Sequence, residues 1–236
     1  MLATLSARPA DVREIRIRTA DAAPAWKRVL EAAERHGVTV RPPEQTPSRG
    51  RPEGRNDGRQ TAASAIVTPK PETPLTNLLS SETEQSASED RGVWLLLEHV
   101  QDPHNVGAIL RTAGFFGVQG VLLTKDQSAA LTAVAYDIAA GGVEAVPYCT
   151  VTNVSRTIDA AREAGLWVLG TSEHAEQPLR SVEPDRRWLA VVGNEESGLR
   201  RLTRDKCDTL VGIPGNGPVG SLNVSVAAGI LLSHLS

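Results

Sequence analysis

Short apolar runs alternate with longer helix-like stretches between residues 91 and 236. The apolar runs are 92–97, 120–124, 167–170, 188–193 and 209–213. Unbroken apolar runs of this length are typical of strands buried on both faces of a parallel sheet, and the stretches between them supply the helical crossovers. The pattern therefore predicts an α/β domain with a parallel sheet over 91–236.

A weaker pattern precedes this domain. Strands are predicted over 14–19, 38–40 and 62–67, with a helix over 24–36 that begins at Pro24 and stops at Gly37. Residues 41–60 are rich in Pro, Gly and Arg, so they carry too little apolar surface to order themselves. Residues 80–90 are polar and acidic, as in a linker. We therefore expect a small α/β domain over 1–79, a disordered-looking insertion at 41–60, and a linker at 80–90.

Composition narrows the class of protein. A formal net charge of −3 argues against a wholly basic nucleic-acid surface, so any RNA contact has to be local. Two cysteines, Cys149 and Cys207, are too few for a disulfide framework and indicate a reducing cytoplasm. No run predicts a membrane span or a secretory signal. His99 and His104 lack metal-site spacing, so no metal is expected.

The first apolar run leads into a helix that carries Asn105 and Arg111. Either Asp102 or Asn105 can accept a hydrogen bond from the free N–H groups that open this helix. A helical projection gathers the apolar side chains on one face and places Arg111 opposite them, among mostly small neighbours. This predicts half of an active site, although the segment alone fits a capped helix with an exposed arginine equally well.

A second loop follows the strand at 188–192. In open parallel sheets, ligands bind at the carboxyl ends of the strands. Gly193 permits a tight turn, and Asn194, Glu195 and Glu196 are expected at the N-terminus of a helix, where acidic side chains favour the helix dipole. Taken alone, this loop favours a well-capped helix.

A third loop follows the strand at 209–213 and contains Gly215, Gly217 and Gly220. These glycines free the backbone to fold around a ligand, and Ser221 can cap the apolar closing helix. The spacing GxGxxG occurs in dinucleotide-binding folds, but no further strand or acidic residue follows it at the required distance. No phosphate-binding loop of the GxxxxGK[ST] type is present either.

The three loops together resemble the ordered motifs of the SpoU/TrmH branch of the SPOUT superfamily, which are RNA ribose 2′-O-methyltransferases. They read HNVGAILRTAGFFG, VVGNEESGLRRLT and IPGNGPVGSLNVSVAAGILL. The resemblance runs from about Gly92 to Ser236 and is similar to the subgroup that methylates guanosine in 23S ribosomal RNA. It implies a parallel sheet with a C-terminal trefoil knot, S-adenosylmethionine as methyl donor, and a homodimer in which the first-motif helix lies near the partner's cofactor loop. The N-terminal part is similar to a small α/β RNA substrate-binding domain.

The family's functional residues carry over onto matching positions. The catalytic set implied by the resemblance is Arg111, Asn105, Glu195, Ser221 and Asn223. The cofactor-binding set is Thr171, Gly193, Asn194, Glu195, Ile213, Leu222 and Asn223. Because a guanidinium holds its proton strongly and is a poor base, we expect Arg111 to clamp a phosphate and stabilise developing alkoxide charge.

Arg200, Arg201, Arg204 and Lys206 form a local basic cluster, and the first three are expected, with Arg111, to bind RNA. The alternative is a solvated helix face. The chain departs from the family at Gly215, where many members have Met. The missing side chain bears on how the loop packs around the adenine and on the affinity for the cofactor.

The resemblance implies methyl transfer from S-adenosylmethionine to a ribose 2′-hydroxyl of ribosomal RNA. Transfer RNA is the alternative substrate. A non-catalytic RNA-binding or ribosome-assembly protein would keep the fold and the basic cluster, but retention of Arg111 and Asn223 argues against it. A nucleotide-dependent oxidoreductase is disfavoured by the position of the glycine motif.

Overall fold

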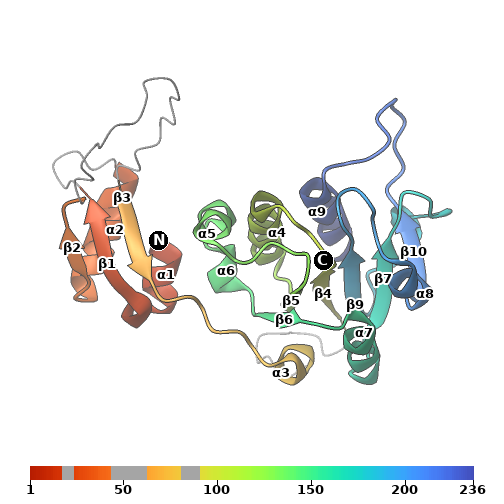
Figure 1. The fold of residues 1–236 in the computed structure, drawn as a ribbon, viewed down its shortest axis with the longest axis horizontal. Helices are drawn as coiled ribbons and strands as arrows, with labels where there is room; N and C mark the ends of the chain where they lie inside the picture. Colours follow the sequence, from red (N-terminus) through yellow and green to blue (C-terminus); the bar gives the residue numbers. More distant parts are fainter. Residues whose placement is uncertain (18–23, 44–62, 81–90) are drawn as a thin grey trace. The chain divides into compact units, whose positions relative to one another are not determined.

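The computed structural model describes residues 1–17, 24–43, 63–80 and 91–236 (Figure 1). The chain forms two compact units, Met1–Lys70 and Pro71–Ser236. Residues 44–60 of the predicted insertion and 81–90 of the predicted linker lie outside the described residues. Within the described part, no helix has the length and hydropathy needed to cross a membrane.

The small unit is a three-stranded sheet with helices. Its strands run in the order β2-β1-β3, with β2 parallel and β3 antiparallel to β1. Its elements are α1 (Leu2–Ala7), η1 (Pro9–Asp11), β1 (Val12–Ile17), α2 (Pro24–Arg35), β2 (Thr39–Arg41) and β3 (Ala63–Val67). Leu5, Ile15 and Ala33 are fully buried between the sheet and the helices, which gives this unit its own core. The predicted helix and three strands are confirmed, with ends shifted by one or two residues where both ends are described.

The large unit contains a seven-stranded sheet in the order β6-β5-β4-β9-β7-β10-β8, in which all recorded strand pairs are parallel. Its strands are β4 (Gly92–Leu97), β5 (Gly120–Thr124), β6 (Tyr148–Val151), β7 (Trp167–Thr171), β8 (Gln177–Pro178), β9 (Arg187–Val192) and β10 (Thr209–Gly212). Its helices are α3 (Leu75–Leu79), α4 (Pro103–Phe116), α5 (Ala133–Ala139), α6 (Gly142–Ala145), α7 (Val154–Glu163), η3 (Leu179–Ser181), α8 (Arg201–Asp205) and α9 (Val224–Leu235). The predicted parallel α/β domain is confirmed.

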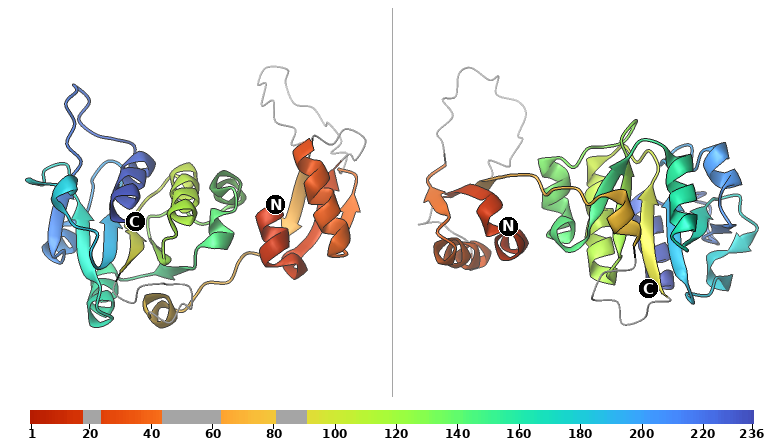
Figure 2. Two further views of the ribbon diagram at one scale, coloured as in Figure 1. Left: turned by 180° about the vertical axis from the view of Figure 1, so that it is seen from behind. Right: turned by 90° about the horizontal axis from the view of Figure 1, so that it is seen from below.

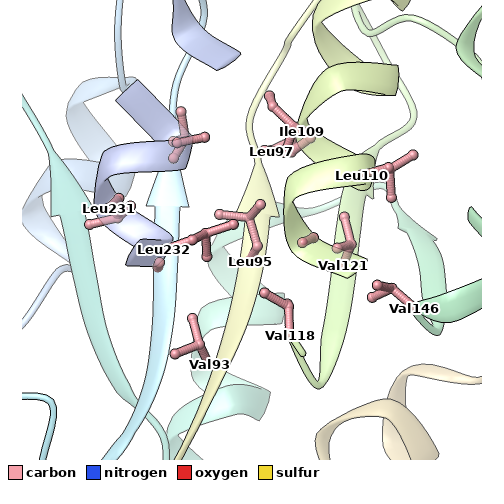
Figure 3. Packing of buried hydrophobic residues seen from close by; sticks show 14 of the residues in the cluster. Val93, Leu95, Leu97, Ile109, Leu110, Val118, Val121, Val146, Leu231 and Leu232 are labelled. Atoms are coloured by element: carbon pink, nitrogen blue, oxygen red, sulfur yellow. The ribbon is translucent and has the colours of Figure 1, made fainter. Parts of the chain in front are cut away.

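Helices cover both faces of this sheet (Figures 1 and 2). Alternate residues of β4 enter different cores: Leu95 packs with α4 and α9 on one face (Figure 3), whereas Trp94 and Leu96 pack with α3 and α7 on the other. Burial on both faces explains why the strand is an unbroken apolar run rather than an alternating one. It also fixes the end of β4, and with it the start of α4, at one edge of the sheet.

The sequence pattern does not predict two strands of the large unit. Tyr148–Val151 forms β6 and Gln177–Pro178 forms β8, each at one edge of the sheet. The first is a short run interrupted by Thr150, and the second has no apolar run at all. Their extended conformation therefore comes from pairing with β5 and β10 rather than from local composition.

The predicted domain boundary at residue 79 is wrong, because α3 belongs to the large unit. Leu78 and Leu79 are buried in the core that contains Trp94, and the Trp94 indole donates a hydrogen bond of 2.6 Å to the carbonyl of Leu78. The division between units lies after Lys70.

Candidate active site

The first predicted loop becomes a capped helix at the carboxyl edge of the sheet. The Asp102 side chain accepts a hydrogen bond of 2.8 Å from the His104 N–H, and Pro103 occupies the first turn, where no N–H is needed. The predicted apolar face of α4 is confirmed, since Val106, Ile109, Leu110 and Ala113 are buried. Because Asp102 caps the helix, the Asn105 side chain is left to make other contacts.

Asn105 joins the three predicted loops through its amide. Its side chain is 8% exposed; Nδ2 donates to Glu195 Oε1 at 3.0 Å, and Oδ1 accepts from Asn223 Nδ2 at 3.0 Å. A carboxylate only accepts hydrogen bonds, so Asn105 must turn its N–H₂ group toward Glu195. The amide oxygen of Asn105 then faces the other way and accepts a hydrogen bond from Asn223. The structure thus brings together three of the five predicted catalytic residues, one from each motif.

The loop between β9 and α8 is a closed turn and not the predicted start of a helix. Asn194 and Gly198 exchange two backbone hydrogen bonds of 3.1 and 3.0 Å. Gly193 is required here because a Cβ would come within 2.3 Å of the Gly198 carbonyl carbon. α8 begins only at Arg201 and has no acidic residue in its first turn, so Glu195 and Glu196 do not serve its dipole.

Asn194 orders the inside of this turn. Its Oδ1 accepts from the Glu196 N–H at 3.0 Å and from both the N–H and the hydroxyl of Ser197 at 3.1 Å. Its Nδ2 donates to the His99 carbonyl at 2.9 Å, and the Gln101 N–H lies 3.5 Å from Glu195 Oε2. The segment after β4 therefore supports the turn, a role that the sequence analysis missed. The available signal was Glu98, a charged residue that ends the apolar run.

The third loop runs from β10 to α9, and residues 214–223 are exposed. The prediction that Ser221 caps the closing helix is wrong: Asn223 is the cap, and its Oδ1 accepts from the Ser225 N–H at 2.8 Å and from its hydroxyl at 2.5 Å. Ser221 and Leu222 lie exposed just before this cap. Neither has a recorded hydrogen bond to the described residues, so the structure does not join them to Asn105.

Thr171 and Ile213 lie at the ends of the neighbouring strands β7 and β10. Both are half-buried, and the Thr171 hydroxyl donates to the Val191 carbonyl at 3.3 Å. They therefore line the carboxyl edge between the second and third loops, where the predicted cofactor-binding residues gather.

Arg111 stands apart from the Asn105 group. It is exposed, and the described part of the chain offers it no recorded hydrogen bond or ion pair. It borders a hollow of about 390 Å³ together with Thr112, Gly114, Phe115, Ala139, Ala140, Gly141, Gly142 and Ala145. Six residues of helix separate it from Asn105, which moves it about 9 Å along the axis and onto a different side. Within one chain, Arg111 and Asn105 do not form one hydrogen-bonded site.

The predicted basic cluster is partly neutralised. Arg200 donates to Gln127 Oε1 at 2.7 Å, Arg201 lies 3.6 Å from Asp205, and Lys206 pairs with Asp159. Arg204 is half-buried. The charge that this cluster offers to a phosphate is therefore smaller than its sequence indicates.

Thiol and metal chemistry have little support among the described residues. Burial raises the pKa of both Cys149 and Cys207 to about 12, so neither thiol is a ready nucleophile. In the described part of the chain, no group of three or more His, Cys, Asp or Glu side chains is placed to hold a metal ion.

Comparison with known proteins agrees with this geometry. Residues 92–233 match the model of the SpoU rRNA Methylase family. The chain is 49% identical over 138 residues to the 23S rRNA (guanosine-2′-O-)-methyltransferase RlmB of Nitrosomonas europaea, a match that covers 58% of this chain and 53% of the relative. It is 47% identical over 146 residues to the RlmB of Escherichia coli, covering 62% and 60%. The chain thus spans little more than half the length of these curated relatives.

Solved structures share the fold. An AdoMet-bound rRNA methyltransferase from Sinorhizobium meliloti aligns with a TM-score of 0.74 at 21% identity, over 100% of this chain and 84% of that one. The TrmH/SpoU tRNA modifying enzyme of A. aeolicus aligns with a TM-score of 0.57 at 26% identity, over 68% and 78%. With the family model matched over more than half of its length, and its three motifs meeting at one edge of the sheet, the chain belongs to the SpoU rRNA Methylase family.

Proposed function

We propose that this chain transfers a methyl group from S-adenosylmethionine to a ribose 2′-hydroxyl of ribosomal RNA. The observation that carries the proposal is the hydrogen-bonded chain Glu195–Asn105–Asn223, because it joins one residue from each motif at the carboxyl edge of the sheet. Ribosomal RNA is preferred to transfer RNA because the curated relatives at 45–49% identity are named for 23S rRNA.

The residues at this edge fit S-adenosylmethionine in their chemistry. Exposed Val219 and Leu222, with half-buried Ile213, offer apolar surface to an adenine. The Glu195 carboxylate complements a positively charged donor. We assign the cofactor to Thr171, to Gly193–Asn194–Glu195, and to Ile213, Leu222 and Asn223.

S-adenosylmethionine supplies a methyl group activated by a positively charged sulfur. Asn105 and Asn223 keep the edge of the site in one arrangement, which lowers the cost of aligning the ribose oxygen for in-line attack. Arg111 binds the phosphate next to the target ribose and stabilises the negative charge that develops on the 2′-oxygen. Ser221 orders the substrate side of the third loop.

A second copy of the chain completes the site. Among the described residues Arg111 has no recorded hydrogen bond or ion pair, and the neighbouring surface carries exposed apolar side chains: Phe115 on α4 is 82% exposed, and Val226 and Ile230 form an exposed row on α9. The helices α4 and α9 pack on each other, so this row adjoins Arg111's helix. We propose a homodimer in which Arg111 of one copy serves the Asn105 site of the other.

RNA approaches along the Arg111 side. The hollow beside Arg111 offers a cation next to mostly apolar, small walls, which suits a phosphate with a neighbouring sugar or base. Arg200, Arg201 and Arg204 add weaker phosphate contacts beyond the second loop. In the small unit, Arg16 and Arg41 lie in register on the sheet face opposite buried Ile15; both pair with Glu14, which leaves one net positive charge among the three, and we assign this unit to substrate RNA.

We further infer that the chain closes in a trefoil knot. β10 pairs with β7 and β8, toward one edge of the sheet, whereas α9 returns to pack on α4 and β9. A return of the chain from the β10 side to the middle of the sheet is compatible with such threading and supports the inference. The family's motif order supports the same path.

The direct test measures methyl transfer from labelled S-adenosylmethionine to ribosomal and transfer RNA, followed by mapping of alkali-resistant ribose positions. We expect 2′-O-methylation of ribosomal RNA. Cofactor binding without transfer to either RNA would favour a non-catalytic RNA-binding role. Transfer to transfer RNA alone would reassign the substrate.

A further inference from the structure

Glu98 is the sole buried carboxylate among the described residues, with 1% of its surface exposed. It follows β4 directly, at the carboxyl edge of the sheet. Removing a carboxylate from water costs several kcal/mol unless hydrogen bonds replace the lost hydration. A shorter apolar side chain would avoid this cost, so the partners of Glu98 indicate what its carboxylate does.

Both carboxylate oxygens of Glu98 bind α8. Oε2 accepts from the Arg200 N–H at 3.0 Å, and Oε1 accepts from the Thr203 hydroxyl at 2.6 Å. Arg200 is the N-cap residue of α8 and its own side chain makes no capping hydrogen bond. Glu98, just after β4, therefore supplies the capping oxygen that the Arg200 side chain does not, and satisfies a free N–H at the start of this helix.

The same residue also holds the other end of the turn. Its backbone N–H donates to the Val192 carbonyl at 2.8 Å, where β9 ends. The loop 193–199 thus lies between Val192, which is bonded to the Glu98 backbone, and Arg200, which is bonded to the Glu98 side chain. The contacts of His99 with Asn194 and of Gln101 with Glu195 extend this support along the next three residues.

We infer that Glu98 is a positioning residue for the methyl-donor site, and that it acts by clamping both ends of the 193–199 loop. The inference rests on the proposed function for the identity of the ligand. A loop already held in its binding shape loses less conformational freedom when the cofactor binds than a loop that must first be ordered. Glu98 touches neither the reacting atoms nor the cofactor in this account; it fixes Glu195, which fixes Asn105.

The test compares three substitutions in the full chain. Glu98→Gln keeps the size but removes the charge and replaces one of the two accepting oxygens with an amide group that cannot accept a hydrogen bond. Thr203→Val removes the hydroxyl, and Thr203→Ser keeps it. We expect the first two to raise the dissociation constant and KM of S-adenosylmethionine about 10-fold, with the KM for RNA unchanged and Thr203→Ser close to wild type. Hydrogen exchange of the amides of 194–199, measured without cofactor, should be faster in Glu98→Gln and Thr203→Val.

Glu72 provides a control with the same hydrogen-bond pattern at an exposed position away from the 193–199 loop. Its carboxylate also accepts from a backbone N–H and a threonine hydroxyl, those of Thr150, at 2.9 and 2.7 Å, but on β6. Glu72→Gln should leave cofactor affinity unchanged. An equal loss of affinity in Glu72→Gln would assign the effect to general stability and overturn the positioning role.

The failures of the two proposals are separable. Wild-type protein that does not bind S-adenosylmethionine overturns the proposed function. Wild-type protein that binds it, with Glu98→Gln and Thr203→Val showing the same affinity and the same exchange rates, overturns the positioning role alone. If Glu98→Gln does not fold, the Thr203→Val and Thr203→Ser pair decides the question.

Discussion

Asn105 and Asn223 lie 118 residues apart in the chain and share a hydrogen bond of 3.0 Å between their side-chain amides. Each amide also has a second duty: Asn105 donates to Glu195, and Asn223 caps α9 through its oxygen. The Asn223 N–H₂ group donates to Asn105 in the site, and the Asn223 oxygen caps α9. The two duties can therefore be separated by substitution.

Asn223→Asp should reduce methyl transfer while preserving stability. The Asp side chain caps a helix as well as Asn, but it presents a carboxylate oxygen to Asn105 Oδ1 in place of a donor. Asn223→Ala removes both functions and should also cost about 1 kcal/mol of unfolding free energy, the usual loss for an N-cap. Thermal unfolding alongside the transfer rate checks this. Equal melting temperatures for the two variants would contradict the capping role.

Arg111→Ala should lower the methyl-transfer rate by about 100-fold or more, the scale of losing one charge-stabilising donor, while cofactor binding persists. Arg111→Lys should recover only part of this loss, because lysine keeps the charge but lacks the planar fork that holds a phosphate. The matched control is Arg156→Ala, an exposed arginine on α7. Rates from single-turnover assays decide the matter, and an unchanged rate in Arg111→Ala would remove Arg111 from the mechanism.

Mixing two inactive variants should restore activity if the site is shared between copies. Arg111→Ala retains an intact Asn105 group, and Asn105→Ala retains an intact Arg111. A randomly assorted dimer population would regain about one quarter of wild-type activity, since half the dimers are mixed and each has one complete site. The assay is transfer after co-refolding or co-expression. No recovery from folded, dimeric mixtures would place both residues in one protomer's site.

Gly193→Ala should lower the methyl-transfer rate by about 100-fold, the effect of displacing a site by about 1 Å, because a Cβ would lie 2.3 Å from the Gly198 carbonyl carbon. Gly215→Ala is the control, since nothing lies within 4 Å of a Cβ there. Gly215→Met restores the residue common in the family and should tighten cofactor binding, which calorimetry measures. A Gly193→Ala variant of normal activity would show that the turn does not need its close approach.

The strands of the large unit were predictable where burial on both faces leaves an unbroken apolar run, as in β4 and β9. β6 was not, because the pairing that makes it a strand comes from a neighbour distant in sequence. The boundary before α3 failed for a similar reason. In the sequence, nothing distinguishes Leu78 from an ordinary helix residue. Its contact with Trp94, 16 residues later, is seen only in the structure.

Three of the predicted site residues, Asn105, Glu195 and Asn223, meet in the structure, but the hydrogen bonds that join them could not be predicted. Periodicity placed Arg111 away from the core, and the exposed guanidinium agrees. The sequence predicted Asp102 or Asn105 as the cap of α4 and Ser221 as the cap of α9. Capping depends on which residue stands with a non-helical backbone just before the helix, and for α9 this is Asn223 in place of Ser221. The amide orientation of Asn105 depends on Glu195, 90 residues away, which no local pattern encodes.

The link between Asn105 and Asn223 also has a consequence for the order of events during protein synthesis. A growing chain can form β4, α4 and β9 and can bring Glu195 to Asn105 before Asn223 has left the ribosome. Until then, the amide oxygen of Asn105 lacks its partner, and α9, which follows Asn223 in the chain, has not yet emerged. Nascent chains should therefore acquire a stable sheet well before they acquire a competent methyl-donor site, so that unfinished chains neither retain the cofactor nor modify RNA.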